Sequence, residues 1–278
     1  MPQLLKSLPL EKLERSLRLR EPVPPKSSWE RETGRGVSYK FGKYSFTIIS
    51  SSGADESIVI EEDCSIIATR VWDCAALTAK WIESISTKRQ PRPNLTEALA
   101  LKNNTNGKKR QIQVLELGAG LGLLSVCLAK MGAAVMSSEY GVAVRYLKES
   151  CDSNNVTVES DQPLSAGGVK CRELDWFKTE ETLESLFLPG EVPIFDLIVV
   201  TDCTLAEKEA HAVAAMFHKY GTKGHTKGLA GACIQREGTP SFIKRVQEDF
   251  DNVVVVPTSE QHPQFTTPRH TILKFDIQ

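Results

Sequence analysis

The chain has 278 residues, of which 41% are hydrophobic and 25% are charged, and its formal net charge is -1. This composition is typical of globular proteins, and the length suits one large α/β domain with extensions or two small domains. A net charge near zero excludes a whole-protein field that attracts nucleic acid or an anionic membrane. No apolar run approaches the about 18 residues that span a bilayer, so we expect no membrane partner and disfavour nucleic acid.

Residues 1–36 predict a short N-terminal helix followed by a linker, outside a main domain at 37–278. Leu10, Leu13 and Leu17 share one helical face, and the breaker-rich run EPVPPKSSWERETGRG comes next. The pattern fits a loosely attached helix or, alternatively, a helix that docks onto a partner. The segment also resembles a mitochondrial presequence, but its acidic residues disfavour that interpretation.

The seven cysteines are dispersed along the chain and none has the spacing of a zinc ligand set. Cysteines of this kind, in apolar segments, are typical of small hydrophobic residues kept reduced in the cytosol or nucleus. We therefore predict no metal site and a cytoplasmic location, with the nucleus as the alternative compartment.

Residues 37–110 combine three features ahead of the regular part of the chain. The stretch VSYKFGKYSFTIIS at 37–50 alternates around Gly42-Lys43, which predicts a β-hairpin with its turn at these two residues. Residues 68–85 predict a helix. Residues 86–110 are polar and locally basic, which predicts a solvated insertion or, alternatively, a contact with an acidic partner.

Beyond residue 111, strand-like and helix-like segments alternate. The predicted strands cover 111–117, 133–139, 169–176, 195–202, 228–235, 252–257 and 270–277, and the predicted helices cover 123–131, 142–154, 181–187, 206–220 and 240–250. Alternation of this kind predicts a mostly parallel, doubly wound sheet that helices cover on both faces. The last two strands have no helix between them, so they are expected to pair as an antiparallel hairpin at one edge.

The glycines of ELGAGLG follow the first strand of this sheet, where doubly wound folds bind their ligands. Dinucleotide sites favour G-x-G-x-x-G, whereas Gly118, Gly120 and Gly122 are spaced G-x-G-x-G, and Leu123 stands at the third-glycine position. Glu116 precedes the loop, and a carboxylate there repels a pyrophosphate but suits the ammonium and sulfonium of S-adenosylmethionine. The residues favour S-adenosylmethionine over NAD and over a glycine turn without a ligand.

Glu139 ends the second predicted strand, about twenty residues after the glycines, and is placed to accept hydrogen bonds from ribose hydroxyls. NAD enzymes share this feature, so Glu139 indicates an adenosine ligand without choosing between the two cofactors. Structural alternatives remain for both carboxylates. Glu116 fits a strand-end salt bridge, and Glu139 fits a carboxylate at a helix N-terminus.

Five stretches of the chain occur in the order found in one family of enzymes. They are RVWDCAALTAKWIE, VLELGAGLGLLSVCLAKMGA, ELDW, FDLIVVTD and CIQREGTPSFIKRVQEDF. The chain resembles the seven-β-strand protein-lysine methyltransferases of methyltransferase family 16, which are small enzymes that modify proteins other than histones. The resemblance covers roughly residues 37–277 and implies a Rossmann-like class I methyltransferase fold. It also implies S-adenosylmethionine as the cofactor and a lysine side chain of a protein as the acceptor.

The resemblance assigns roles to individual positions. It implies that Trp72 lines the cofactor site, that Gly118, Ala119 and Gly120 carry the methionine part, and that Glu139 holds the ribose. Asp175 and Trp176 are placed beside the adenine, Thr201 precedes the motif D-x-x-Y/F, and Asp202 matches its catalytic Asp. Core packing of either tryptophan and helix capping by Asp202 are the structural alternatives. Asp202 and nearby carbonyls are expected to orient an amine that loses its proton in a desolvated channel.

Leu205 departs from the family pattern, since it stands where the motif has Tyr or Phe. Leucine keeps an apolar wall but lacks the π face that attracts a cation. Three functions therefore stay open at this point: a protein-lysine methyltransferase, a methyltransferase of small molecules, and an adaptor of this fold with little or no activity. The family modifies chaperones, ATPases and translation factors, which makes such a protein the expected partner of a monomeric chain.

Overall fold

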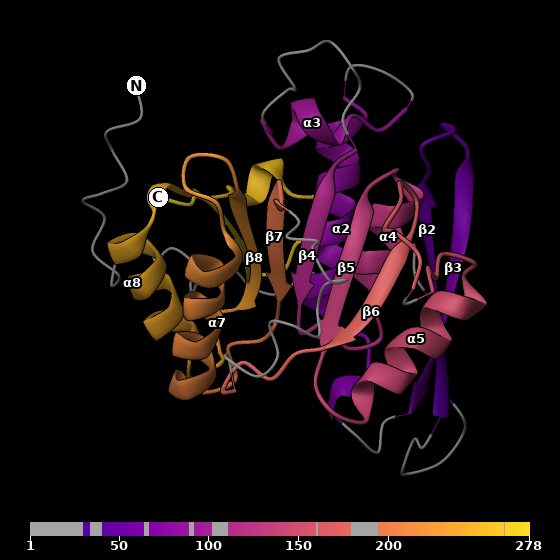
Figure 1. Cartoon of the computed structure of the whole chain (residues 1–278), viewed down its shortest axis with the longest axis horizontal. Coiled ribbons are helices and arrows are strands. Elements are labelled where there is room, and N and C mark those ends of the chain that lie inside the picture. Colours follow the sequence, from indigo (N-terminus) through magenta and orange to yellow (C-terminus); the bar gives the residue numbers. More distant parts are fainter. Residues whose placement is uncertain are drawn as a thin grey trace.

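The computed structural model describes residues 30–33, 41–63, 67–88, 92–101, 111–159, 161–178, 194–263 and 265–278. The predicted helices at the N-terminus and at 181–187 lie outside these ranges. Within them, a seven-stranded sheet and a three-stranded sheet form the framework (Figure 1).

The seven-stranded sheet has the order β6-β5-β4-β7-β8-β10-β9. Its strands are β4 (Gln113–Leu117), β5 (Ala134–Glu139), β6 (Val169–Glu173), β7 (Leu197–Thr201), β8 (Lys227–Cys233), β9 (Asp251–Val255) and β10 (His270–Asp276). The first five run parallel, whereas β10 is antiparallel to both β8 and β9. This confirms the predicted fold and the pairing of the last two strands. The strand order reverses between β4 and β7, which is where doubly wound sheets bind ligands.

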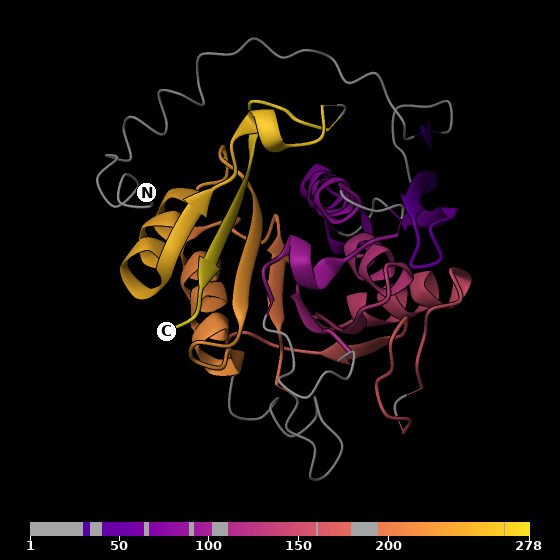
Figure 2. The ribbon, with the colours of Figure 1, turned by 90° about the horizontal axis from the view of Figure 1, so that it is seen from above.

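Helices cover both faces of this sheet (Figure 2). Those on one side are α2 (Asp73–Ser86), α4 (Leu123–Lys130) and α5 (Ala143–Ser153), and those on the other are α7 (Glu207–Tyr220) and α8 (Thr239–Asp249). Each side has its own buried cluster. On β4, for example, Val114 belongs to the first cluster and Leu115 and Leu117 to the second. Burial on both faces explains why the central strand β7 is a near-continuous apolar run.

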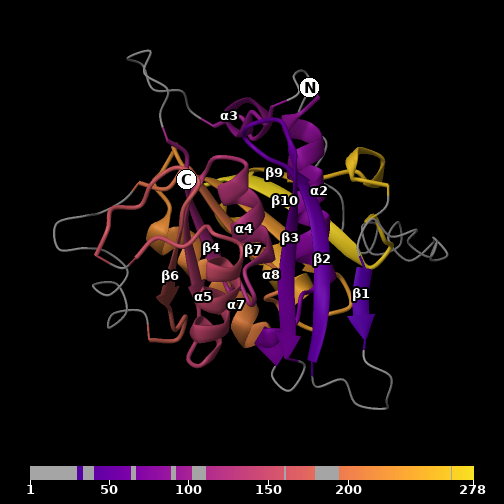
Figure 3. The ribbon, with the colours of Figure 1, turned by 90° about the vertical axis from the view of Figure 1, so that its right-hand side faces the viewer.

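The three-stranded sheet stands beside α4 and α5 and has the order β1-β2-β3 (Figure 3). It consists of β1 (Glu30–Thr33), β2 (Phe41–Ile49) and β3 (Asp55–Asp63), all antiparallel. The predicted N-terminal hairpin is therefore present, but the position of its turn was wrong. The chain passes straight through Gly42-Lys43 in β2 and turns at 50–54, where the amide of Ser50 bonds the carbonyl of Ala54 at 2.8 Å. Alternation of side chains continued across the glycine, so periodicity alone misplaced the turn.

Two boundaries near the insertion also differ from prediction. Helix α2 begins at Asp73, after the short 3₁₀ helix η1 (Ile67–Thr69), and not at residue 68. The insertion contains helix α3 (Leu95–Ala98), in which Asn94 caps the first turn, and Leu95 and Leu101 are buried. The described part of the insertion is thus anchored to the core and is not wholly solvated. No helix among the described residues is long and apolar enough to cross a membrane.

Candidate cofactor and active site

The loop between β4 and α4 brings the backbone close to neighbouring segments at two glycines. Gly118 has a φ of +64°, and a Cβ atom there would lie 2.6 Å from the Sγ atom of Cys203 and 2.9 Å from the Cζ2 atom of Trp176. Gly120 has a φ of +56°, and a Cβ atom there would lie 3.1 Å from the carbonyl oxygen of Ala68. A side chain at Gly118 would collide with Cys203 and Trp176, and one at Gly120 would strain the backbone and press on the carbonyl of Ala68. The loop therefore presents bare backbone at the end of the first strand.

Glu139 binds this loop from the end of β5. Its Oε2 atom accepts a hydrogen bond from the amide of Gly120 at 2.7 Å, and its Oε1 atom accepts one from the amide of Tyr140 at 2.9 Å. Burial raises the pKa of Glu139, and the two amides oppose this shift. The carboxyl is thus held beside the glycine backbone, and its predicted hydrogen bonds to ribose hydroxyls stay a prediction.

A cavity of about 530 Å³ lies beside Glu139. It is lined by Glu139 and Tyr140 after β5, by residues 174–178 after β6, and by Glu209 of α7. Asp175 and Trp176 therefore line this cavity, and their predicted places beside an adenine stay a prediction. Asp175 also accepts a hydrogen bond from the amide of Phe177 at 2.9 Å, which fixes the turn after β6. Flat apolar walls next to carboxylates suit an aromatic base with a polar sugar.

Glu116 has a different environment from the one that its predicted role assumed. Its side chain points to the α4 side of β4, is 1% exposed, and accepts a hydrogen bond from the hydroxyl of Ser125. Burial raises the pKa of Glu116 to about 8, so its carboxyl is mainly protonated at neutral pH. A fixed negative charge that repels a pyrophosphate is therefore absent at this position. A contact between Glu116 and the ligand stays a prediction.

Asp202 follows β7 in a left-handed conformation with a φ of +57°, which is uncommon for residues other than glycine. Its two carboxyl oxygens lie 3.3 Å from the Nε and Nη2 atoms of Arg236, and its amide bonds the carbonyl of Gly231 at 2.8 Å. The Asp202 side chain is only 4% exposed. This geometry describes a paired, buried carboxylate and not a helix cap, because α7 begins five residues later at Glu207 with no side-chain cap.

Trp72 lies on the far side of Arg236. The guanidinium carbon of Arg236 is 4.8 Å from the centre of the Trp72 ring, and the indole nitrogen donates to the carbonyl of Ile67 at 3.2 Å. The tryptophan thus packs against the arginine that holds Asp202, and its predicted contact with the cofactor stays a prediction.

Cys203 connects the glycine loop to the end of β7, where Asp202 lies. Its thiol lies 3.4 Å from the carbonyl oxygen of Gly118 and 3.2 Å from that of Thr201. Thr201 is buried at the end of β7, and Leu205 is 37% exposed just before α7. The glycine loop thus contacts the residue that directly follows Asp202, while the Glu116 carboxyl is buried against α4.

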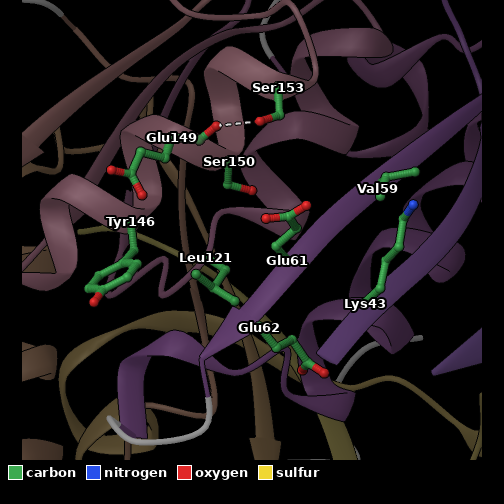
Figure 4. A pocket seen from close by; sticks show the side chains of 9 residues that line it. All are labelled: Lys43, Val59, Glu61, Glu62, Leu121, Tyr146, Glu149, Ser150 and Ser153. Carbon is green, nitrogen blue, oxygen red and sulfur yellow. Dashed lines mark hydrogen bonds between the residues drawn. The ribbon is translucent and has the colours of Figure 1, made fainter. Parts of the chain in front are cut away.

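A second cavity, of about 480 Å³, lies beyond the glycine loop between the three-stranded sheet and α5. Figure 4 shows Glu61 and Val59 of β3 facing Ser150 and Tyr146 of α5 across it. Leu121 lines it from the loop, but none of the predicted site residues does. The cavity beside Glu139 is therefore the candidate for the adenosine ligand.

Comparison with known proteins decides the family. A sequence model described as lysine methyltransferase, of methyltransferase family 16, matches residues 53–249. The chain belongs to this lysine methyltransferase family. Membership confirms the predicted enzyme class, a methyltransferase, and the predicted cofactor, S-adenosylmethionine, at the level of the family.

This member of the lysine methyltransferase family is similar to two proteins of known identity. It is 28% identical over 167 residues to the mouse (Mus musculus) protein N-lysine methyltransferase METTL21A. This alignment covers 59% of this chain and 62% of METTL21A, so the chain spans less than two thirds of that protein's length. The 16S rRNA N2 G1207 methyltransferase RsmC of T. thermophilus, solved with AdoMet and guanosine, is 16% identical with a TM-score of 0.53. That alignment covers 89% of this chain and 53% of the other, and it shows the shared fold.

Three residues near the site were not among the predicted ones. Arg236 lies in the quoted stretch CIQREGTPSFIKRVQEDF, but no local pattern indicates that it pairs with Asp202, 34 residues earlier. Cys203 read as a small hydrophobic residue, although its position directly after Asp202 was a signal. Glu209 resembled an ordinary acidic residue in the first turn of a helix.

Proposed function

We propose that this chain is an S-adenosylmethionine-dependent protein-lysine N-methyltransferase that acts on a non-histone protein. One observation carries the proposal: the Gly118 backbone of the glycine loop lies close to Trp176 of the cavity beside Glu139, and it also contacts Cys203, the residue directly after Asp202. A cofactor half and an acceptor half are thus adjacent at the same edge of the sheet. The cofactor half comprises residues 118–122, Glu139, Asp175 and Trp176, and the acceptor half comprises Trp72, Asp202 and Arg236.

The residues of the cofactor half fit the proposed ligand. Gly118 lets Trp176 and Cys203 approach the backbone of the loop, Glu139 offers carboxyl oxygens to ribose hydroxyls, and Trp176 offers a flat apolar wall. When bound, S-adenosylmethionine supplies an electrophilic methyl group on a sulfonium. The contribution of the chain is to orient the acceptor in line with this group and to exclude water.

The acceptor half orients the amine. Arg236 neutralises Asp202 and holds its carboxyl with two parallel contacts, which leaves further lone pairs on Oδ1 and Oδ2 for an incoming N–H group. The amine donates to Asp202 and keeps its own lone pair directed at the methyl group. A desolvated channel lowers the pKa of a lysine and favours the neutral, nucleophilic form.

The test is methyl transfer to protein. Purified chain and methyl-labelled cofactor are incubated with host lysate, and labelled proteins are hydrolysed to identify the modified amino acid. We expect label in methylated lysine of a non-histone protein. Label in arginine, in small molecules, or in nothing at all contradicts the proposal.

Asp202→Asn is the informative variant, because asparagine also tolerates a left-handed backbone. It is expected to lower methyl transfer about a hundredfold, by loss of the charge-assisted contact to the amine. Its affinity for S-adenosylhomocysteine, measured by calorimetry, is expected to stay within about twofold of the original chain, since Asp202 is not among the residues that line the cavity. Equal transfer by both proteins would remove Asp202 from the mechanism.

A further inference from the structure

His270 is the first residue of β10, and its place in the fold brings it to the edge of the sheet that holds Asp202. Because β10 runs antiparallel to β8, its first residue lies at the carboxyl ends of the parallel strands, opposite Cys233 at the end of β8. The amide of Asp202 bonds the carbonyl of Gly231, two residues before Cys233 on the same strand. Asp202 and His270 therefore flank the end of β8 from its two sides.

The His270 side chain projects to the face of the sheet that α2 covers. Residues two apart along a strand share a face, and so do directly opposed residues of antiparallel strands. Ile272 follows His270 by two residues and belongs to the buried cluster to which α2 contributes. Gly231 lies opposite Ile272, and a Cβ atom on it would collide with the hydroxyl of Thr78 in α2. His270 thus lies on the same face as α2.

Asp202 reaches this face as well. Its partner Arg236 packs against Trp72, the residue directly before α2. Burial, and next the negative charge of Asp202, raises the pKa of the Cys74 thiol in the first turn of α2. The acceptor half and His270 are therefore on one side of the sheet.

One nitrogen of the His270 ring is held and the other is open to solvent. Nδ1 lies 2.8 Å from the hydroxyl of Thr267, whose oxygen also accepts a hydrogen bond from the amide of Arg269 at 3.2 Å. Nε2 has no hydrogen-bond partner in the described part of the chain and, unlike the indole nitrogen of Trp81, is not sealed from solvent. The residue as a whole is only 7% exposed. When Nδ1 donates its proton to Thr267, Nε2 presents a lone pair.

The charges of the acceptor half act on this ring. Burial lowers the pKa of His270 below its ordinary value of 6.5, and the carboxylates of Asp73 and Asp202 oppose this shift. The guanidinium groups of Arg269 and Arg236 lower the pKa further. The ring is therefore mainly neutral at pH 7 and able to accept a proton.

The other titratable groups around His270 are poorer proton acceptors. The two arginines keep their protons, and carboxylates are ordinarily far weaker bases than imidazole. Asp202 is moreover engaged with Arg236 through both carboxyl oxygens. Cys74 and Cys233 are thiols, which ordinarily carry their protons at neutral pH.

We propose that His270 is the general base of the transfer, with Nε2 accepting the proton that the lysine ammonium loses. The neutral lysine nitrogen then takes the methyl group through its lone pair, and the electron pair of the broken C–S bond stays on sulfur. Asp202 orients the amine, and the proton on Nε2 passes to solvent after the product leaves. The inference rests on the proposed lysine methyltransferase function and adds a catalytic residue to it.

The pH dependence of transfer tests the role of His270 through His270→Gln, which keeps a polar side chain but takes up no proton. Label in lysine of host-lysate protein is measured between about pH 6 and pH 9. The variant is expected to be about a hundredfold slower at pH 7, and less than about tenfold slower at pH 9, where more of the amine is neutral without a base. A loss by the same factor at every pH, as a structural defect produces, overturns the proposal, and so do equal rates.

His218→Gln is the matched control, because His218 is 46% exposed and pairs with Asp249 at 2.9 Å. It is expected to keep the original pH profile, and calorimetry should give both variants an affinity for S-adenosylhomocysteine within about twofold of the original chain. An NMR titration of the original chain adds a measurement without a variant. The pKa of the His270 ring should lie below 6.5 and match the midpoint of the acidic limb of the rate profile at limiting acceptor, and a mismatch overturns the proposal. No label in lysine with the original chain refutes the proposed function itself, whereas label with a constant rate ratio refutes only the role of His270.

Discussion

The cofactor half and the acceptor half of the site are built in different ways. In the cofactor half, backbone conformations at Gly118 and Gly120 and amide bonds to Glu139 do most of the positioning. In the acceptor half, Asp202, Arg236 and Trp72 meet through side chains from three separate parts of the chain. The first kind of construction leaves a short motif in the sequence, and the second does not.

Gly118→Ala is expected to have the largest effect, because it breaks the cofactor half alone. The new methyl group would collide with Cys203 and Trp176, and affinity for S-adenosylhomocysteine should fall about a hundredfold, or about 3 kcal/mol. Gly224→Ala is the matched control, since Gly224 has the same φ of +64° but nothing within 4 Å of its Cβ position. Both variants should lose about 1–2 kcal/mol of stability through backbone strain. Equal loss of affinity in both would contradict the steric account.

Arg236→Gln should break the acceptor half and spare the cofactor half. It leaves the buried Asp202 carboxylate without its partner, so methyl transfer should fall about tenfold or more, while affinity for S-adenosylhomocysteine changes less than about twofold. Arg245→Gln removes a surface pair with Asp249 at 2.6 Å and should leave both quantities unchanged. Parallel losses of transfer and of affinity in Arg236→Gln would show that the two halves are not separable.

Glu116 gives a smaller effect, visible in stability. Its pKa is about 8 in the folded chain against an ordinary value of 4.5, so between these values the folded state holds a proton that the unfolded state releases. Stability from this group is fully present below pH 4.5 and is lost as pH rises through 8. Denaturant unfolding of the original chain should lose about 1 kcal/mol more than Glu116→Gln between about pH 7 and pH 8. Identical pH profiles would mean that Glu116 is ionised.

The smallest effect is expected beyond the glycine loop, in the cavity of Figure 4. Glu149→Gln removes an exposed pair with Arg145 at 2.7 Å and should cost under about 0.5 kcal/mol in unfolding experiments. Affinity for S-adenosylhomocysteine should not change, because Glu149 lines the other cavity. A clear loss of affinity would indicate that the ligand binds in the cavity lined by Glu149 and not in the cavity beside Glu139.

Much of the fold could be predicted because its signals are local. The alternation of strands and helices after residue 111 predicted the sheet and the pairing of its last two strands. The hairpin turn was misplaced because β2 keeps its alternation through Gly42, and α2 was begun too early because the apolar pattern continues through the 3₁₀ turn before it. Periodicity reports which residues are buried, but it does not report where a chain reverses.

The site could be predicted to the same extent and for the same reason. The glycines and Glu139 lie within one strand-loop-helix-strand unit, so their meeting follows from the motif. The partner of Asp202 depends on the path of the chain between β7 and α8, and the burial of Glu116 depends on the face of β4 that it occupies. Charge at Glu116 was inferred from residue type, whereas its protonation is set by the low-dielectric surroundings.

Titration of the purified chain with S-adenosylhomocysteine, and separately with NAD, tests the central claim most directly. The account predicts that one S-adenosylhomocysteine binds per chain, that binding is weakened in Gly118→Ala but not in Gly224→Ala, and that NAD gives no measurable heat. Absence of S-adenosylhomocysteine binding, or tighter binding of NAD, would contradict the assignment of the cavity beside Glu139 to this cofactor.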